Sequence, residues 1–401
     1  MMTAGLPFGL LAWHRLVERP SLVRALVVGL AIVAQALFCG YYAVFLVLII
    51  ALAATVYAAQ RGRAGEGWFW AVHAVAFIVA AIALLPLFIP YFQVGRAGFR
   101  RTLEEAAIFS ADWRAYLASG VPAHRWILTH LSGWAEVLFP GIIPTVATVA
   151  AAIRIVWFRN SHSPEDRQGA ALYGILCVAA VWLSFGPKAG LYGWVYTAFP
   201  VMQWLRAPAR FGVTVALCFA ILTAFAVRDL RRSVRSPRVI GLLVIAATGV
   251  EHAAPLRFPT VPATSGIYRI LAKLPPGPVV EFPYFFRRDD VFGHSSYMLR
   301  STAHWHPLIN GYSDVLPAGF LDEARTIAGF PGADAVRLLQ ARGARYVVIH
   351  FSEFADGGCN MRARLLAIVP PVRPLAHAGA DYLYELTRDV HSADNKFGAR
   401  G

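Results

Sequence analysis

The chain changes character near Glu251. Before this residue, long apolar runs alternate with short loops rich in arginine, whereas after it the apolar residues fall in short periodic groups. An apolar run of about 20 residues is long enough to cross the hydrocarbon core of a bilayer. The sequence therefore predicts an α-helical polytopic membrane domain over residues 1–252, a small α/β domain over 253–389 and a disordered tail over 390–401.

About seven membrane spans are predicted from the apolar runs. The first run, residues 25–59, is too long for one ordinary span and is interrupted at Cys39 and Gly40. We therefore interpret it as two short helices joined by a tight turn. The predicted spans lie near residues 25–39, 42–59, 68–90, 136–158, 169–186, 211–228 and 239–250.

The positive charge is concentrated in the membrane half. Up to Val250 there are 21 Lys+Arg against 9 Asp+Glu, compared with 16 against 14 afterwards, and 57% of the whole chain is hydrophobic. Short basic loops stay on the cytoplasmic side of a membrane, so the loop 228–238, with its five arginines, predicts that side. Counting spans from it places the C-terminal domain outside an inner (plasma) membrane. Nucleic-acid binding is not expected, because no soluble segment combines a basic patch with interleaved aromatic residues.

The predicted outer loop, residues 91–135, carries the first candidate site. Glu105 and Asp112 lie there among arginines and aromatic residues. A carboxylate at this level could serve as a general base or metal ligand for a polar substrate at the lipid headgroups. The alternative is a solvated amphipathic helix lying on the bilayer, with arginines that pair with its own acids and with lipid phosphates.

A second outer loop, residues 186–211, is rich in Gly, Pro and aromatic residues. Arg206 and Arg210 are four residues apart, so in a helical turn they would face the same way and could grip a phosphate or pyrophosphate. Aromatic residues such as Tyr192, Trp194 and Trp204 would then line a slot for an acyl or prenyl chain. The alternative is an interfacial belt in which the arginines extend to lipid headgroups.

The third candidate lies in the C-terminal domain. His304 and His306 would share one face of a strand, with Asn310 and Asp314 close behind. A His-X-His pair near a carboxylate can bind zinc, although no third ligand stands at a firm spacing. A hydrogen-bonded turn or a polar contact surface is the alternative. Glu281, inside the apolar strand 278–282, is a further candidate.

Three strands and three helices are predicted in this C-terminal domain. The strand-like runs are 278–282, 345–351 and 382–386, and helical spacing occurs over 267–274, 320–329 and 333–343. The alternation predicts a small α/β domain.

The chain resembles bacterial multispanning membrane glycosyltransferases of the GT-C type. The resemblance covers nearly the whole chain and rests on CGYYAVF at 39–45, RRTLEEAAIFSADWRAYLAS at 100–119, LFPG at 138–141, FGPKAGLYGWVY at 185–196 and FPVMQWLRAPARF at 199–211, with VVEFP, STAHWHPLINGYS and RGARYVVIH in the C-terminal domain. The resemblance implies an enzyme that takes a sugar from a polyprenyl-phosphate carrier on the outer face. It also implies membrane lipid and a polyprenyl-phosphate-linked sugar as partners.

The chain departs from this family pattern at its N-terminus. Such proteins usually begin with further spans, and an early outer loop carries the acidic residue taken as catalytic, whereas this chain starts at what resembles a middle span. The resemblance thus leaves three options: a truncated form, a partner subunit that supplies the missing half, or a non-catalytic module that binds a lipid-linked glycan. If the protein is an enzyme, Arg206 and Arg210 would hold the carrier phosphate while Glu105 or Asp112 assists the acceptor.

No cofactor is assigned, and a divalent cation stays an option. Ion-coupled transport is disfavoured, because the predicted spans carry almost no charge.

Overall fold

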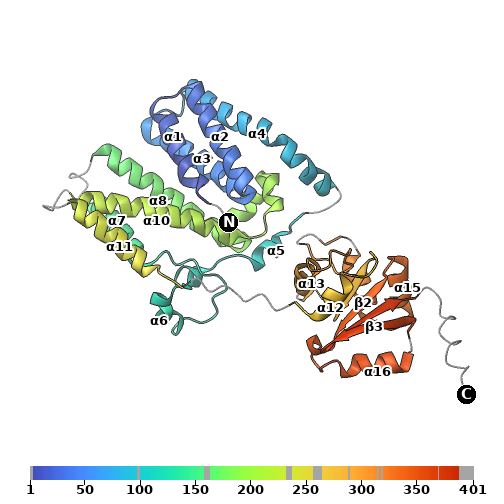
Figure 1. Ribbon diagram of the computed structural model, residues 1–401. Coiled ribbons are helices and arrows are strands. Elements are labelled where there is room, and N and C mark those ends of the chain that lie inside the picture. Colours follow the sequence, from blue (N-terminus) through green and yellow to red (C-terminus); the bar gives the residue numbers. More distant parts are fainter. Residues whose placement is uncertain are drawn as a thin grey trace, which may run out of the picture. The chain divides into compact units, whose positions relative to one another are not determined.

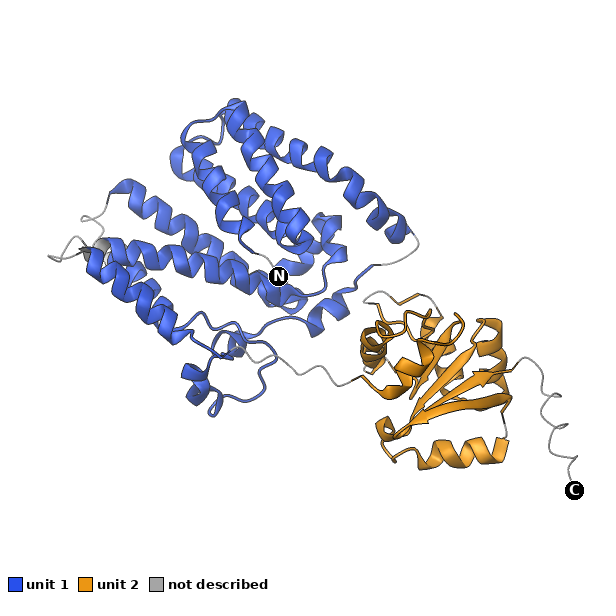
Figure 2. Ribbon diagram, viewed as in Figure 1, with its two compact units in different colours: residues 1–256 blue, residues 257–401 orange. Residues whose placement is uncertain are grey.

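The computed structural model divides the chain into two compact units, Met1–Leu256 and Arg257–Gly401 (Figure 2). It describes residues 3–96, 100–157, 163–231, 237–255, 264–287, 290–313, 316–317, 319–368 and 370–387. The predicted disordered tail and Asp314 lie outside these residues. Each unit is described by itself below.

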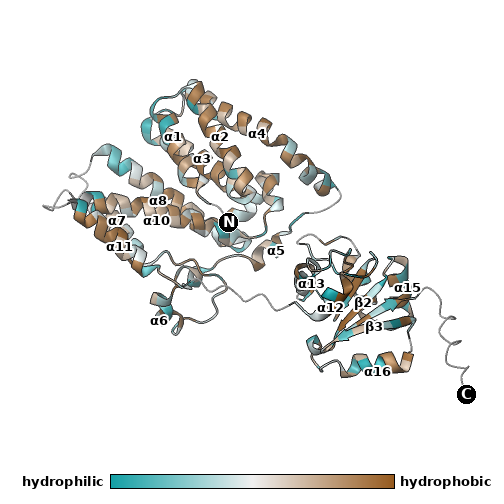
Figure 3. Cartoon of the chain, viewed as in Figure 1, coloured by the Kyte–Doolittle hydropathy of each residue, from teal (hydrophilic) through white to brown (hydrophobic). Residues whose placement is uncertain are grey.

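Unit 1 is a helical bundle (Figure 1). Its helices are α1 (Gly5–Glu18), α2 (Leu22–Phe38), α3 (Gly40–Arg61), α4 (Gly67–Arg96), α5 (Leu103–Ile108), α6 (Arg125–Leu128), α7 (Ile142–Trp157), α8 (Pro164–Ser184), α9 (Leu191–Ala198), α10 (Gly212–Arg231) and α11 (Pro237–Glu251). The long helices are apolar along most of their length (Figure 3), and many of their large apolar side chains face outward, including Ile82, Val178 and Ile245. An apolar exterior is the surface that a lipid solvent requires.

Four described segments are long and apolar enough to cross a membrane. They are Gly40–Arg61, Gly67–Arg96, Pro164–Ser184 and Pro208–Arg228. Helices α2, α7 and α11, at 17, 16 and 15 residues, fall short of the usual span length, because 15 residues of α-helix rise only about 23 Å. The structure thus shows a helical protein of membrane type without establishing seven spans.

The N-terminal segment forms a helix that the sequence reading did not assign. Trp13 of α1 is fully buried and donates its indole N–H to Nε2 of His73 in α4 at 3.1 Å. Helix α2 also approaches α4 closely, because a Cβ on Gly29 would lie 2.8 Å from the carbonyl oxygen of Ala76. As expected, α2 and α3 meet in a tight break, at Cys39.

The arginines that follow α3 and end α10 lie at one end of the bundle, here called the arginine end. Arg63, just after α3, donates to the carbonyl of Val17 in α1 at 3.1 Å. Arg61 lies 3.9 Å from Glu165, and Arg228 lies 2.7 Å from Asp166, so the ends of α3 and α10 meet the start of α8. The opposite end, here called the loop end, holds Tyr41 and residues 100–141 and 185–211.

Unit 2 is an α/β domain whose four-stranded sheet has the order β1-β2-β4-β3. Strands β1 (Val279–Phe282) and β2 (Tyr346–His350) are parallel, while β4 (Asp381–Leu386) is antiparallel to β2 and to β3 (Val372–Ala378). The helices are α12 (Gly266–Leu271), α13 (His294–Ser301), α14 (Phe320–Ala328), α15 (Ala333–Ala341) and α16 (Cys359–Ile368). Strand β3 and helices α13 and α16 were absent from the sequence prediction.

Both faces of β1 and β2 are covered. On one face, Val280, Phe282 and Ile349 pack in a core with α14, α15 and α16. On the other face, Val279 and Val348 pack with residues of α12. Alternate residues of a strand point to opposite faces, so Glu281 lies on the α12 side, inside the protein.

Candidate functional site

Tyr41 organises the loop end of unit 1. Its hydroxyl accepts the backbone N–H groups of Arg206 and Ala207, the latter at 2.9 Å. The guanidinium of Arg210 lies over the Tyr41 ring, 4.4 Å from its centroid. Tyr41 therefore joins α3 to the segment that carries both arginines.

Arg206 and Arg210 each stack on an aromatic ring and do not share an α-helical turn. Ala207 has φ −121° and ψ 85°, and the 3₁₀ helix begins only at Pro208, so the i,i+4 geometry expected from the sequence is absent. Arg206 stacks on Phe109 instead, at 4.8 Å, while Arg210 stacks on Tyr41. Both side chains are half-buried, and no carboxylate pairs with Arg210 among the described residues.

The two candidate carboxylates have local partners. Glu105 in α5 forms an ion pair with Arg101 at 2.7 Å. Asp112 caps the 3₁₀ helix Trp113–Tyr116, because its Oδ1 accepts the N–H of Ala115 at 3.1 Å. These contacts match the interpretation in which the loop pairs its own charges. Glu105 nevertheless lies one helical turn before Phe109, on which Arg206 stacks, so it shares that face of α5.

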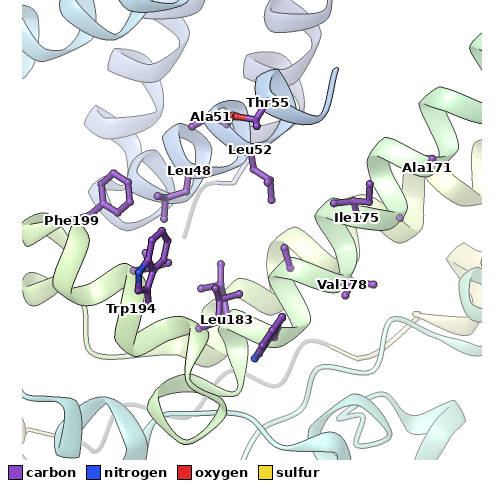
Figure 4. Close-up of a pocket in the computed structure, with 15 residues that line it drawn as sticks. Leu48, Ala51, Leu52, Thr55, Ala171, Ile175, Val178, Leu183, Trp194 and Phe199 are labelled. Carbon is purple, nitrogen blue, oxygen red and sulfur yellow. The ribbon is translucent and has the colours of Figure 1, made fainter. Parts of the chain in front are cut away.

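An apolar groove lies between α3 and the α8–α9 region (Figure 4). Its cavity volume is about 830 Å³, within the usual range for ligand pockets. Figure 4 shows Leu48, Leu52 and Thr55 on one side, with Ile175 and Val178 of α8 opposite. The Thr55 hydroxyl and the indole N–H groups of Trp182 and Trp194 are the polar side-chain atoms of its lining.

One stripe of α3 connects the groove to the arginines. Tyr41, Phe45, Leu48, Leu52 and Thr55 follow one another at intervals of three and four residues, so they share one helix face. Leu48 lies seven residues from Tyr41, which is about 10 Å along the axis. An amphiphile with its chain in the groove would therefore have its headgroup close to Arg210.

The aromatic residues expected to line a chain-binding slot are distributed differently. Tyr192 is buried and donates its hydroxyl to the carbonyl of Leu205 at 3.3 Å, so it braces the loop from inside. Trp204 packs on Phe88 and Phe92 of α4 and not in the groove. Of the three expected aromatic residues, Trp194 lines the groove, and its 68% exposure fits a contact with lipid.

A buried histidine–carboxylate contact also occurs at the loop end. His124 Nε2 lies 2.9 Å from Glu251, the last residue of α11, and His124 Nδ1 lies 2.8 Å from the hydroxyl of Ser119. The Glu251 carboxylate also accepts the N–H groups of Ile142 and Ile143 and so caps α7. We call this contact of Glu251 with His124 and the start of α7 the clasp; the sequence analysis did not predict it.

The histidines and Asn310 of unit 2 are structural in this fold. Asn310 is fully buried and bonds both to the N–H of Glu281 at 2.6 Å and to its carbonyl at 2.8 Å, so it pairs with the edge of β1. His306 Nδ1 lies 3.1 Å from the carbonyl of Gly277, and its N–H donates to His304 Nδ1 at 3.0 Å. Both histidines belong to the loop after α13 rather than to the expected strand. Burial, together with the neighbouring His306, lowers the pKa of His304 to about 4, so His304 is a neutral acceptor.

The interior of unit 2 holds a charged network that the sequence indicated only through Glu281. His350, at the end of β2, lies 2.9 Å from Glu281 and 2.8 Å from Asp381. Tyr268 of α12 donates to Glu281 at 2.5 Å. Burial alone would lower the pKa of His350, but the hydrogen bonds and charges of Asp381 and Glu281 raise it to about 9. Strand pairing brings these groups together from positions 69 and 31 residues away along the chain.

Within the described ranges, no group of three or more His, Cys, Asp or Glu side chains is arranged to hold a metal ion. Comparison with known proteins finds no matching family model, curated protein or solved structure.

Proposed function

We propose that unit 1 binds a lipid-linked sugar of the polyprenyl-phosphate class. The observation that carries this proposal is the apolar groove, whose α3 wall lies on the same helix face as Tyr41, the residue on which Arg210 stacks. The chain of the lipid lies along Leu48 and Leu52, and its phosphate is held by Arg210 together with Arg206. Cationic side chains that are half-buried beside aromatic rings bind phosphate more strongly than fully hydrated ones.

The same proposal assigns an orientation in an inner (plasma) membrane with seven spans. The arginine end faces the cytoplasm, since short basic loops mark that side, and the loop end faces outward. Because α11 ends at the loop end, where Glu251 caps α7, unit 2 follows on the extracytoplasmic side.

A substitution that fills the groove tests whether the polyprenyl chain of the lipid binds there. Gly174 lines the groove, and a Cβ added there meets no atom within 4 Å, so Gly174→Leu places a side chain in the groove without a clash in the fold. The matched control is Gly241→Leu, because Gly241 is also a helical glycine with open space but lies outside the groove. In nanodiscs, Gly174→Leu should weaken binding of undecaprenyl phosphate about tenfold, a loss of about 1.4 kcal/mol.

The phosphate contact is tested separately. Arg210→Gln should weaken undecaprenyl phosphate binding about tenfold or more and leave binding of the uncharged undecaprenol unchanged. Equal binding of undecaprenyl phosphate by the parent and both the Gly174 and Arg210 variants would contradict the proposal.

Transfer of the sugar is a second candidate function, and Glu105 favours it. Glu105 lies four residues before Phe109, on which the Arg206 guanidinium stacks, and its side chain is 25% exposed. It could therefore take a proton from an acceptor hydroxyl beside the bound carrier phosphate. Glu105→Gln should abolish hexosyl transfer from a polyprenyl-phosphate sugar while lipid binding persists, and Glu104→Gln, at the adjacent exposed position, is the control. Binding without transfer by the parent protein would leave the non-catalytic module as the function.

A further inference from the structure

Trp305 is displayed on the surface of unit 2 by a strained backbone. It is the one non-glycine residue of the described chain with a positive φ, 56°, and it is 81% exposed. A bulky residue in this region is unfavourable and persists only where its surroundings fix it. An exposed tryptophan in such a conformation indicates a surface that contacts something else.

The neighbours of Trp305 fix its conformation. His304 and His306 on either side are buried, and the His304 ring stacks on Tyr268 with centroids 5.7 Å apart. The N–H of Trp305 donates to the carbonyl of Ser301 at 2.8 Å, at the end of α13. The two buried histidines therefore anchor the loop and direct the indole between them outward. This gives His304 and His306 a role that the zinc interpretation did not foresee.

Three further exposed apolar residues lie close to Trp305 in the sequence. Phe292, Met298 and Leu299 are 59%, 42% and 52% exposed, and they lie just before Trp305, in and beside α13. Phe292 and Leu299 are seven residues apart, and the exposed positions between and after them carry the small residues Ser295, Ser296, Thr302 and Ala303. We call Phe292, Met298, Leu299 and Trp305 the α13 surface. Residues 291–306 contain no Asp or Glu, and their one arginine, Arg300, pairs with Glu353 at 2.6 Å.

We infer that the α13 surface docks on the lipid–water interface of the membrane. Tryptophan is the residue that prefers this interface, since its ring is apolar and its N–H can still reach water or headgroups. Phe, Leu and Met beside it enter the acyl boundary, and the hydroxyls of the serines and Thr302 stay among the headgroups. The absence of acidic residues removes repulsion from anionic lipids.

The segment between α11 and α12 keeps unit 2 close to the membrane. Helix α11 ends at Glu251 and α12 begins at Gly266, so 14 residues separate unit 2 from the last apolar helix. Even fully extended, such a segment spans at most about 48 Å. A bilayer surface is therefore always within reach of unit 2. Because unit 1 already anchors the chain, the contact of the α13 surface with lipid forms at a high effective concentration. This inference does not depend on what unit 1 binds.

The test places a fluorescent probe beside Trp305 without replacing it. The parent protein carries Cys359→Ser, and its residual labelling is measured first. Leu299→Cys is then introduced and labelled with an environment-sensitive fluorophore, and the full chain is reconstituted in nanodiscs. Nitroxide-labelled lipids should quench this probe at least about twofold more than the same probe at Leu366→Cys. Leu366 is the matched control, because it is 82% exposed on α16 of the same unit. Adding Trp305→Ala to the Leu299→Cys protein should reduce the difference by about half or more.

Two results would overturn the inference. Equal quenching at the two positions would show that the α13 surface does not meet lipid. A probe signal that responds to soluble oligosaccharide and not to nitroxide lipids would show that the surface is a carbohydrate contact instead. The labelled protein should unfold at the same urea concentration as the unlabelled parent, so that a difference in quenching is not due to altered folding.

Discussion

Each unit buries a histidine against a carboxylate, but different groups stabilise the buried charge of the two pairs. In unit 1, the Glu251 carboxylate shares its charge between His124 and the start of α7, so a helix end carries part of the compensation. In unit 2, His350 lies between Glu281 and Asp381, and side-chain charges carry it. The same kind of pair thus connects the end of α11 to the start of α7 in unit 1, and it links β1, β2 and β4 in the core of unit 2. In the second arrangement, stability depends on a charged imidazole.

The largest expected effect is on the unit 2 pair. His350→Ala leaves Glu281 and Asp381 buried without their cation, which should lower the free energy of unfolding of unit 2 by about 3–5 kcal/mol. His377→Ala is the control, because His377 is exposed on β3 and should change stability by less than about 0.5 kcal/mol. A fluorophore on Cys359, which is exposed on α16, can follow urea unfolding of unit 2 in the full chain. Similar losses in the two variants would show that the buried network contributes little.

A smaller effect is expected from pH. The pKa of His350 is about 9 in the folded protein against 6.5 for a free histidine, so its stabilisation is complete below pH 6.5 and is lost as pH rises through 9. Unit 2 should therefore lose about 1–3 kcal/mol between pH 6.5 and 9.5 in the same urea experiment. The His350→Ala variant should lack this dependence, and a parent with a flat profile would indicate that His350 is neutral.

The smallest effect is expected from the unit 1 pair. Glu251→Ala removes the cap of α7 and the partner of His124, which should cost about 1–2 kcal/mol. Thermal unfolding of the purified chain in detergent measures this loss, and Glu136→Ala, in the same loop region but outside the clasp, serves as the comparison. A loss as large as that of His350→Ala would mean that the His124 pair depends on charge as strongly as the unit 2 pair does.

Long periodic segments were the part of the fold that the sequence predicted well. The apolar runs became α3, α4, α8 and α10, and the break at Cys39 separates α2 from α3. In unit 2, the runs at 278–282, 345–351 and 382–386 became β1, β2 and β4, and Gly343 follows α15 with φ 73°. The helices are long apolar runs, and β1 and β2 are short runs buried on both faces. Strand β3, VRPLAHA, lacks such a run because most of its residues stay partly exposed, and α1 is too short and too polar at its C-terminal end to resemble a span.

The candidate sites were harder to predict, because they depend on contacts between distant residues. Spacing suggested that Arg206 and Arg210 cooperate, but the sequence could not show that Tyr41, about 165 residues earlier, is what joins them. Nor could it show that Gly174 opens a groove opposite Leu48. Asn310 and His306 resembled ligands, since buried polar side chains that complete a strand edge have the same composition as a polar site.

The cover that Asn310 provides for β1 also affects how unit 2 can associate. An open strand edge is a template for pairing with another chain. At one edge of the sheet, Leu308 bridges to Val279 and Asn310 occupies the backbone groups of Glu281. At the other edge, β3 carries Pro374 and an irregularity between Pro374 and Ala376, which interrupt a regular ladder. Unit 2 is thus protected against edge-to-edge aggregation, and any assembly with another protein has to use side-chain surfaces instead of a shared sheet.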